Sequence, residues 1–171
     1  DYADPNADIW IYAAAGDPTP KPENYAGPRN FYEYLQTVQK DGEHGEAFAY
    51  KSVNTDALAW VIARASGKDF VQHLSERIWK PLGMEQEADM MVDSLGTPLS
   101  AGGLSLSLRD AARFGQTMLQ GGVWNGEQVI PKAAVESISG GGSPEKFVSA
   151  GYTTLDGGSY RSQWWALHNE N

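Results

Sequence analysis

Residues 50–67 read YKSVNTDALAWVIARASG, and the rest of the chain is best interpreted outward from this stretch. Apolar residues recur in it at spacings of three and four, which predicts an amphipathic helix with one buried face. The positions on that face are Val53, Ala57, Leu58, Val61, Ile62 and Ala65. Ser66-Gly67 predicts the end of the helix, because glycine readily adopts the left-handed conformation that closes helices.

A tyrosine, a hydroxyl and an amide stand at the start of this helix, at Tyr50, Ser52 and Asn54. A tyrosine beside a cation can lose its proton below its usual pKa of about 10 and then act as a base. A packed tyrosine, with Ser52 or Asn54 capping the helix, explains the same residues without any chemistry. The pattern alone leaves both interpretations open.

The first thirty residues are predicted to be irregular. Proline follows another residue at five places, which favours extended or turn geometry and opposes a continuous helix. These places are Asp4-Pro5, Asp17-Pro18, Thr19-Pro20, Lys21-Pro22 and Gly27-Pro28. The aromatic residues of this stretch favour a functional surface loop over a linker.

The remaining pattern is a helical block followed by strands. Helices are predicted at 29–40, from Asp69 to the residue before Pro81, at 107–119, where Ser107 and Asp110 resemble a capping box, and from Pro131 to about Ile138. Aromatic and β-branched residues at 147–155 and 159–167 flank Asp156-Gly157-Gly158, which predicts a β-hairpin. The predicted fold class is therefore α+β, with residues 1–139 mostly loop and helix and 140–171 in strands.

Composition excludes several functions. The net charge of −9 argues against nucleic acid as a partner, and the absence of cysteine excludes disulfides and thiol catalysis. His44, His73 and His168 share no ligand spacing, so we expect no metal and no cofactor. No apolar run could span a bilayer and no signal peptide is visible. A cytoplasmic location is favoured and a periplasmic one stays open.

Three motifs occur in an order that resembles the class C β-lactamase and DD-peptidase-like serine hydrolases. The first is the tyrosine segment 50–67, with its Tyr-x-Ser loop and its helix ending in Ser-Gly. The second is IWKPLGM at 78–84, and the third is AGGLS at 101–105, followed by Asp110, Arg113 and Phe114. This resemblance implies a β-lactamase/transpeptidase-like fold and hydrolysis of amide, ester or β-lactam bonds through an acyl-enzyme.

Within that family the chain most resembles the 6-aminohexanoate-dimer (nylon-oligomer) hydrolases. DYADP at 1–5 resembles their loop with a substrate-contacting tyrosine, and SYRSQWW at 159–165 resembles their Gln-Trp-Trp strand. The resemblance implies that Tyr50 is the general base and acid, that Ser52 hydrogen-bonds near the nucleophile or substrate, and that Tyr2 covers the bound amide. Near Ala13 those hydrolases can carry an acidic residue, and its absence predicts low activity on the linear dimer.

Two further elements of that family are not found. Its nucleophile lies in a Ser-x-x-Lys motif upstream of the tyrosine, and a Lys/His-x-Gly strand follows the Trp-Trp strand. Ser143-Pro144-Glu145-Lys146 matches Ser-x-x-Lys literally, but it follows three glycines and we expect no apolar helix behind it. We therefore expect residues 1–171 to be the central part of one catalytic domain, truncated at both ends and inactive by itself.

Other interpretations compete with this one. A β-lactamase-like carboxylesterase or D-aminopeptidase is the nearest alternative, and the segment could also be a degenerate, non-catalytic one. A plain structural or interaction domain is the third. The expected partners are a small amide or ester substrate and either a second copy of the chain or the missing remainder of the fold. Exposed strand edges and Trp164-Trp165 predict that the isolated chain is sticky or poorly stable.

Overall fold

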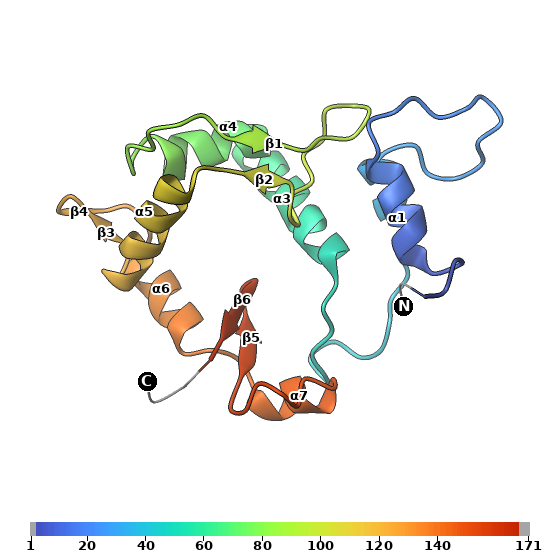
Figure 1. Cartoon of the computed structure of the whole chain (residues 1–171). Coiled ribbons are helices and arrows are strands. Elements are labelled where there is room, and N and C mark those ends of the chain that lie inside the picture. Colours follow the sequence, from blue (N-terminus) through green and yellow to red (C-terminus); the bar gives the residue numbers. More distant parts are fainter. Residues whose placement is uncertain (1–2, 168–171) are drawn as a thin grey trace. The chain divides into compact units, whose positions relative to one another are not determined.

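The computed structural model describes residues 3–167, which form two compact units (Figure 1). The first unit contains residues 3–40, Ser52–Leu74 and Gln86–Ser107. The second unit contains Asp41–Lys51, Ser75–Glu85 and residues 108–167. Among these residues no helix is long and apolar enough to cross a membrane.

The first unit is built from four helices and a pair of short strands. The helices are α1 (Asp8–Gly16), α2 (Phe31–Leu35), α3 (Ser52–Ser66) and α4 (Phe70–Leu74), and β1 (Asp89–Met90) pairs antiparallel with β2 (Leu104–Ser105). The buried apolar residues of this unit are Ala15, Phe31, Tyr34 and Ala59. The Tyr12 ring lies 5.4 Å from the rings of both Phe31 and Tyr34, so aromatic contacts join α1 to α2.

The prediction of irregular structure over the first thirty residues is wrong, because α1 occupies residues 8–16. The prolines at positions 5 and 18 flank this helix and do not interrupt it. Between them lie Ala13, Ala14 and Ala15, and alanine has the highest intrinsic helix propensity. The buried Ala15 adds the tertiary packing that a nine-residue helix needs.

The helix predicted at 29–40 is shorter than expected, because α2 contains only five residues. Its start is fixed by Asn30, whose side chain accepts a hydrogen bond from the backbone N–H of Glu33. Near its end the Thr37 hydroxyl donates to the Tyr34 carbonyl at 2.8 Å. The β-branched Thr37 and Val38 then have low helix propensity, which favours termination there.

The helix that follows Tyr50 is confirmed, but the face predicted to be buried is wrong: Leu58 and Val61 are 44% and 61% exposed, and the buried residues are Asp56 and Ala59. It runs from Ser52 to Ser66 as α3, and Gly67 ends it with a φ of 70° and an N–H that donates to the Ala63 carbonyl. The next predicted helix is also helical: Asp69 accepts a hydrogen bond from the Gln72 N–H at the start of α4. In the second unit a π-helical turn, η1 (Ser75–Trp79), completes the predicted stretch.

The second unit combines three α-helices with two β-hairpins. Its helices are α5 (Leu108–Leu119), α6 (Lys132–Ser139) and α7 (Pro144–Ser149). Its strands pair antiparallel, β3 (Val123–Trp124) with β4 (Glu127–Gln128), and β5 (Ser159–Arg161) with β6 (Trp164–Ala166). The buried apolar side chains are Leu82, Val135 and Phe147. The helices predicted at 107–119 and after Pro131 are thereby confirmed as α5 and α6.

Two strand predictions are wrong. Residues 144–149 form α7 and not the start of a strand, because Ser143 accepts the Lys146 N–H as an N-cap and Pro144 occupies the first turn. The hairpin turns at Ser162 and Gln163, and not at residues 156–158. Both turn residues have positive φ, 49° and 64°, as the two-residue turns that match strand twist require.

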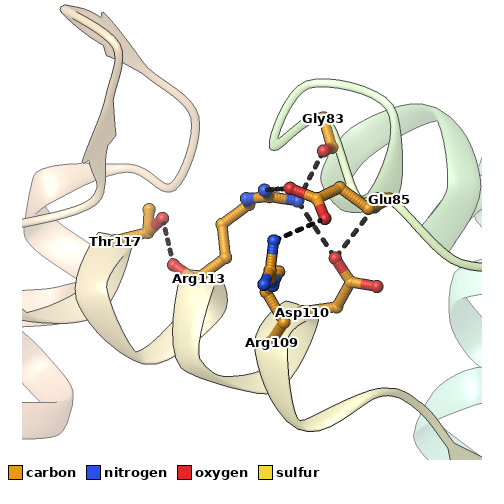
Figure 2. A network of polar contacts seen from close by, with 6 residues as sticks. All are labelled: Gly83, Glu85, Arg109, Asp110, Arg113 and Thr117. Carbon is orange, nitrogen blue, oxygen red and sulfur yellow. Dashed lines mark hydrogen bonds and ion pairs between the residues drawn. The ribbon is translucent and has the colours of Figure 1, made fainter.

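A polar network fixes the turn at 83–85 onto α5, as Figure 2 shows. The Arg113 guanidinium donates to the Gly83 carbonyl at 2.6 Å, to Asp110 at 3.0 Å and to Glu85 at 2.5 Å. Asp110 is fully buried and also accepts the backbone N–H of Glu85 at 2.9 Å. Arg109, which is mostly exposed, reaches Glu85 at 3.4 Å. The network therefore links the PLGM motif to α5 through a buried charge pair, which assigns Arg113 a structural role.

Candidate catalytic site around Tyr50

Tyr50 lies in the second unit, in the segment Asp41–Lys51, with 51% of its surface exposed. Its ring stacks on Trp165 of β6, with centroids 5.9 Å apart and planes 27° apart. Tyr160 of β5 meets it edge-on at 5.9 Å. The structure therefore brings the predicted tyrosine against the β5–β6 hairpin that carries the Gln-Trp-Trp sequence.

The Trp165 ring on which Tyr50 stacks is itself packed in an aromatic cluster. Phe48 contacts Trp165 and the fully buried Phe147, and the N–H of Phe48 donates to the Lys146 carbonyl at 3.4 Å. Tyr152 packs on the same rings. Burial raises the pKa of the Tyr160 hydroxyl above its usual value, and the neighbouring Tyr50 raises it further. A half-exposed tyrosine on a packed aromatic base can meet a substrate while its ring orientation stays fixed.

The cation next to Tyr50 in sequence is already paired. The Lys51 ammonium donates to Asp41 at 2.9 Å, and this bond lowers the pKa of the Asp41 carboxyl. Both side chains are largely exposed, so the pair holds the segment only weakly.

The other two predicted site residues are not brought to Tyr50 by any described contact. Ser52 is the half-buried first residue of α3 and belongs to the first unit. Tyr2 lies outside the described residues. The roles of Tyr50, Ser52 and Tyr2 therefore stay predictions.

In the Ser143–Lys146 motif the serine hydroxyl and the lysine ammonium group do not bind each other. The Ser143 hydroxyl donates to Glu145 at 2.7 Å, while the Lys146 ammonium donates to the Gly45 carbonyl. In an activated serine the base must accept the hydroxyl proton, and here Lys146 is bound elsewhere. The expectation that no helix follows Ser143 is wrong, because α7 begins at Pro144 and buries Phe147. The serine acts as the N-cap of that helix.

Sequence reasoning missed a buried acid–phenol pair in the first unit. The Tyr12 hydroxyl donates to Asp56 at 2.5 Å, and the other oxygen of Asp56 accepts the Ala101 N–H at 3.1 Å. Burial raises the pKa of Asp56, although the bond from Tyr12 acts in the opposite direction. Burial also raises the pKa of Tyr12, helped by the charge of Asp56. The signal in the sequence was a carboxylate three residues after Val53, on the apolar side of the predicted helix.

Within residues 3–167 no three or more His, Asp or Glu side chains are grouped so that they could hold a metal ion.

Residues 7–168 match the beta-lactamase family, and the chain belongs to that family. Its mixture of helices and short antiparallel sheets is α+β, as predicted. The fold resembles a solved structure from Bacteroides dorei that is provisionally named a beta-lactamase. That likeness has a TM-score of 0.56 at 19% identity and covers 77% of this chain and 46% of the other.

Among curated relatives, the 6-aminohexanoate-dimer hydrolase of Paenarthrobacter ureafaciens is 40% identical over 172 residues. The match covers 99% of this chain and 43% of that enzyme. A solved structure from Bacillus anthracis, provisionally named a 6-aminohexanoate-dimer hydrolase, has a TM-score of 0.79 at 34% identity. The match covers 95% of this chain and 41% of the Bacillus anthracis chain.

A shorter stretch of 54 residues is 39% identical to the D-alanyl-D-alanine-carboxypeptidase/endopeptidase AmpH of Escherichia coli K12. It covers 32% of this chain and 14% of AmpH. The resemblance to 6-aminohexanoate-dimer hydrolases and to DD-peptidases is thereby confirmed. The chain spans less than half the length of these relatives.

Proposed function

We propose that this chain is the tyrosine-bearing part of a serine hydrolase that cleaves amide or ester bonds through an acyl-enzyme. The observation that carries the proposal is the setting of Tyr50. It is half exposed, and its ring is held by Trp165 and Tyr160 of the β5–β6 hairpin. The similarity of nearly the whole chain to a named amide hydrolase supports the same reaction class.

In the proposed reaction a serine on a segment outside these residues attacks the substrate carbonyl. Its proton passes to the phenolate oxygen of Tyr50 as the carbon–oxygen bond forms. Collapse of the tetrahedral intermediate breaks the carbon–nitrogen bond, and Tyr50 returns the proton to the leaving amine. Water then attacks the acyl carbonyl as Tyr50 accepts its proton. The bond between the acyl carbon and the serine oxygen breaks, Tyr50 returns the proton to that oxygen, and the acid leaves. Ser52 and Tyr2 would hydrogen-bond the nucleophile or substrate.

The domain proposal follows from the same reasoning. Residues 1–171 are proposed as the central part of one catalytic domain, which other segments complete with the nucleophile and the oxyanion strand. Trp164 and Trp165 are 37% and 42% exposed, which favours association with that remainder or with a second copy. A carboxylesterase or D-aminopeptidase would use the same Tyr50 chemistry on a different acyl group.

Substrate preference depends on α1. Ala13 lies on the exposed side of this helix. Near this position the nylon-oligomer hydrolases can carry an acidic residue, and this chain has none. Without that negative charge, the ammonium group of the linear 6-aminohexanoate dimer has one attractive partner fewer. We therefore expect esters and uncharged amides to be better substrates than the linear 6-aminohexanoate dimer.

Two experiments test the proposal. The 171-residue chain, with a mass of 18.6 kDa, should form no adduct with a serine-reactive phosphonate, whereas a stoichiometric adduct at Ser143 would contradict it. In the second, this chain replaces the matching region of the Paenarthrobacter hydrolase, and hydrolysis of a p-nitrophenyl ester is measured. Tyr50→Phe should lower kcat by about 10²- to 10⁴-fold, the usual worth of a general base.

Tyr152→Phe is the matched control, because Tyr152 belongs to the same aromatic cluster and contacts Trp165. It should keep most of the activity. A folded, inactive graft would contradict the proposed function, and an active graft that is unaffected by Tyr50→Phe would contradict the role of Tyr50.

A further inference from the structure

The first unit contains a cavity of about 360 Å³ that the proposed hydrolysis does not use. Its walls come from α2, from α3, from the start of α4 and from the loop at 95–100. This volume is at the lower end of the range for small-molecule sites. The described residues that line the cavity all belong to the first unit, whereas Tyr50 and the β5–β6 hairpin belong to the second.

Aromatic side chains make one wall of this cavity. The rings of Tyr32 and Trp60 lie 4.7 Å apart, tilted by 48°, and both residues are half-buried. Phe31, which is 3% exposed, and Phe70 add apolar surface. Such a wall can cover an alkyl chain, and the face of an indole also attracts a cation.

The charged groups that line the cavity are all acidic. Asp56, which is 6% exposed, and Asp69 are among the lining residues, and none of the described lining residues is a lysine, arginine or histidine. Arg64 and Lys68 do not line the cavity, but they line a more open groove that shares Tyr32, Trp60 and Asp69 with it. The exposed carboxylate of Asp69 beside an aromatic wall favours a positively charged guest.

The loop that closes the cavity is fixed by buried carboxylates. Asp93 is 2% exposed, and one of its oxygens accepts the N–H groups of Leu95 and Thr97, each at 2.9 Å. Its other oxygen accepts the Phe31 N–H at 2.9 Å. Asp56 binds the Ala101 N–H on the far side of the same loop. The wall is therefore preorganised, which lowers the entropy lost on binding.

We infer that this cavity binds a short aliphatic primary amine in its ammonium form, with the alkyl chain against Tyr32 and Trp60 and the ammonium group at Asp69. One Asp69 oxygen caps α4 through the Gln72 N–H, and a carboxylate can accept further hydrogen bonds. Both oxygens of the buried Asp56 already accept hydrogen bonds, from Tyr12 and Ala101, so the ammonium group is assigned to Asp69 alone. The inference is independent of the catalytic role of Tyr50.

The test uses the ¹⁵N-labelled 171-residue chain and three probes of equal length: n-hexylammonium, 1-hexanol and hexanoate. The indole N–H signal of Trp60 is identified by its loss in Trp60→Leu, and its shift is followed during titration. Hexylammonium should produce a saturable shift at Trp60, and the two other probes should bind at least about fivefold more weakly because they lack the cation. Equal affinity for hexanol, or no saturable shift with hexylammonium, would overturn the inference.

Matched variants locate the site. Asp69→Asn keeps an N-cap for α4 but removes the charge, and should weaken hexylammonium binding by about fivefold. Asp89→Asn, at an exposed aspartate of the same unit, makes the same change in net charge and should leave the affinity unchanged. Trp60→Leu, followed through the backbone amide signals of residues 95–97, should weaken binding by five- to tenfold, about the worth of one cation–π contact, while Trp10→Leu should not. Equal effects of Asp69→Asn and Asp89→Asn would show nonspecific attraction to an acidic chain and would overturn the inference.

Discussion

Arg113→Met in the network of Figure 2 is expected to be among the more destabilising single changes in the second unit. It removes the guanidinium that binds Asp110 at 3.0 Å, Glu85 at 2.5 Å and the Gly83 carbonyl at 2.6 Å. It also removes a cation that lies 5.6 Å from the centroid of the Trp124 ring. Methionine fills much of the same volume, so the measured loss reports mainly the polar contacts.

The magnitude follows from burial. The Asp110 side chain has 0% exposure and that of Arg113 has 14%, so the pair is shielded from solvent. Breaking a buried ion pair by removing one partner costs roughly 3–5 kcal/mol, since the other charge stays buried. Glu85 is 43% exposed and can be rehydrated, so we discount its share. The free energy of unfolding should fall by about 3 kcal/mol, and the melting temperature by about 6–12 °C.

Urea unfolding followed by tryptophan fluorescence measures this change, and Arg109→Met is its control. Arg109 stands on the same helix and contacts the same Glu85, but its side chain is 77% exposed and the contact is 3.4 Å long. Its loss should cost less than about 0.5 kcal/mol. If both variants lowered the urea midpoint equally, burial would not set the strength of this network and the reasoning would be refuted.

Three further predictions concern other contacts. Tyr12→Phe removes the hydrogen bond to the buried Asp56 and should lower the free energy of unfolding by about 1–3 kcal/mol in urea titrations. The pKa of Asp56 is raised in the folded state, so the folded chain binds this proton more tightly than the unfolded chain does. The resulting contribution to the free energy of unfolding is largest at low pH and is lost as the pH rises above about 4 and through the folded pKa. Asp56→Asn should abolish this pH-dependent contribution. Gly142→Ala should destabilise the second unit by about 1–3 kcal/mol in thermal melts, because the new Cβ would lie 2.4 Å from the Tyr160 carbonyl oxygen.

Each of these has an internal control. Tyr25→Phe, in the same unit as Tyr12, should change the free energy of unfolding little. An equal loss of stability in both variants would show that the hydrogen bond to Asp56 contributes nothing specific. For the pH effect the quantity is the difference between the parent chain and Asp56→Asn, because carboxyls with lowered pKa, such as Asp41, act in the opposite direction. Gly115→Ala, in the middle of α5 with no atom near the new Cβ, should be neutral or stabilising.

Long periodic helices were predictable from the sequence, and short elements were not. The apolar spacing after Tyr50 locates α3 almost to the residue, because fifteen residues carry several turns of the helical period, but it does not identify the buried residues, which are Asp56 and Ala59. The nine residues of α1 carry a weaker pattern between prolines, and their stability depends on Phe31 and Tyr34 from α2. At residues 147–149, strand-forming side chains were outweighed by the local cap that Ser143 supplies.

Only part of the candidate site could be predicted from the sequence. Tyr50 could be singled out because a motif carries it, but the Trp165 and Tyr160 rings that hold it come from more than a hundred residues later in the chain. The Tyr12–Asp56 pair joins two helices 44 residues apart, and although Asp56 lies within the segment 50–67, nothing in that motif indicates its partner Tyr12. Such pairings depend on tertiary structure, which local patterns do not encode.

The hydrogen bonds that join the tyrosine segment to α7 have a consequence for folding during translation. The Lys146 side chain binds the Gly45 carbonyl, and its own carbonyl accepts the Phe48 N–H, so partners about one hundred residues apart hold this segment. At a translation rate of roughly 5–20 residues per second, the later partner leaves the ribosome at least about five seconds after the earlier one. During that interval Phe48 and Tyr50 lack the rings that will cover them, which makes the nascent chain most vulnerable to chaperone capture or aggregation there.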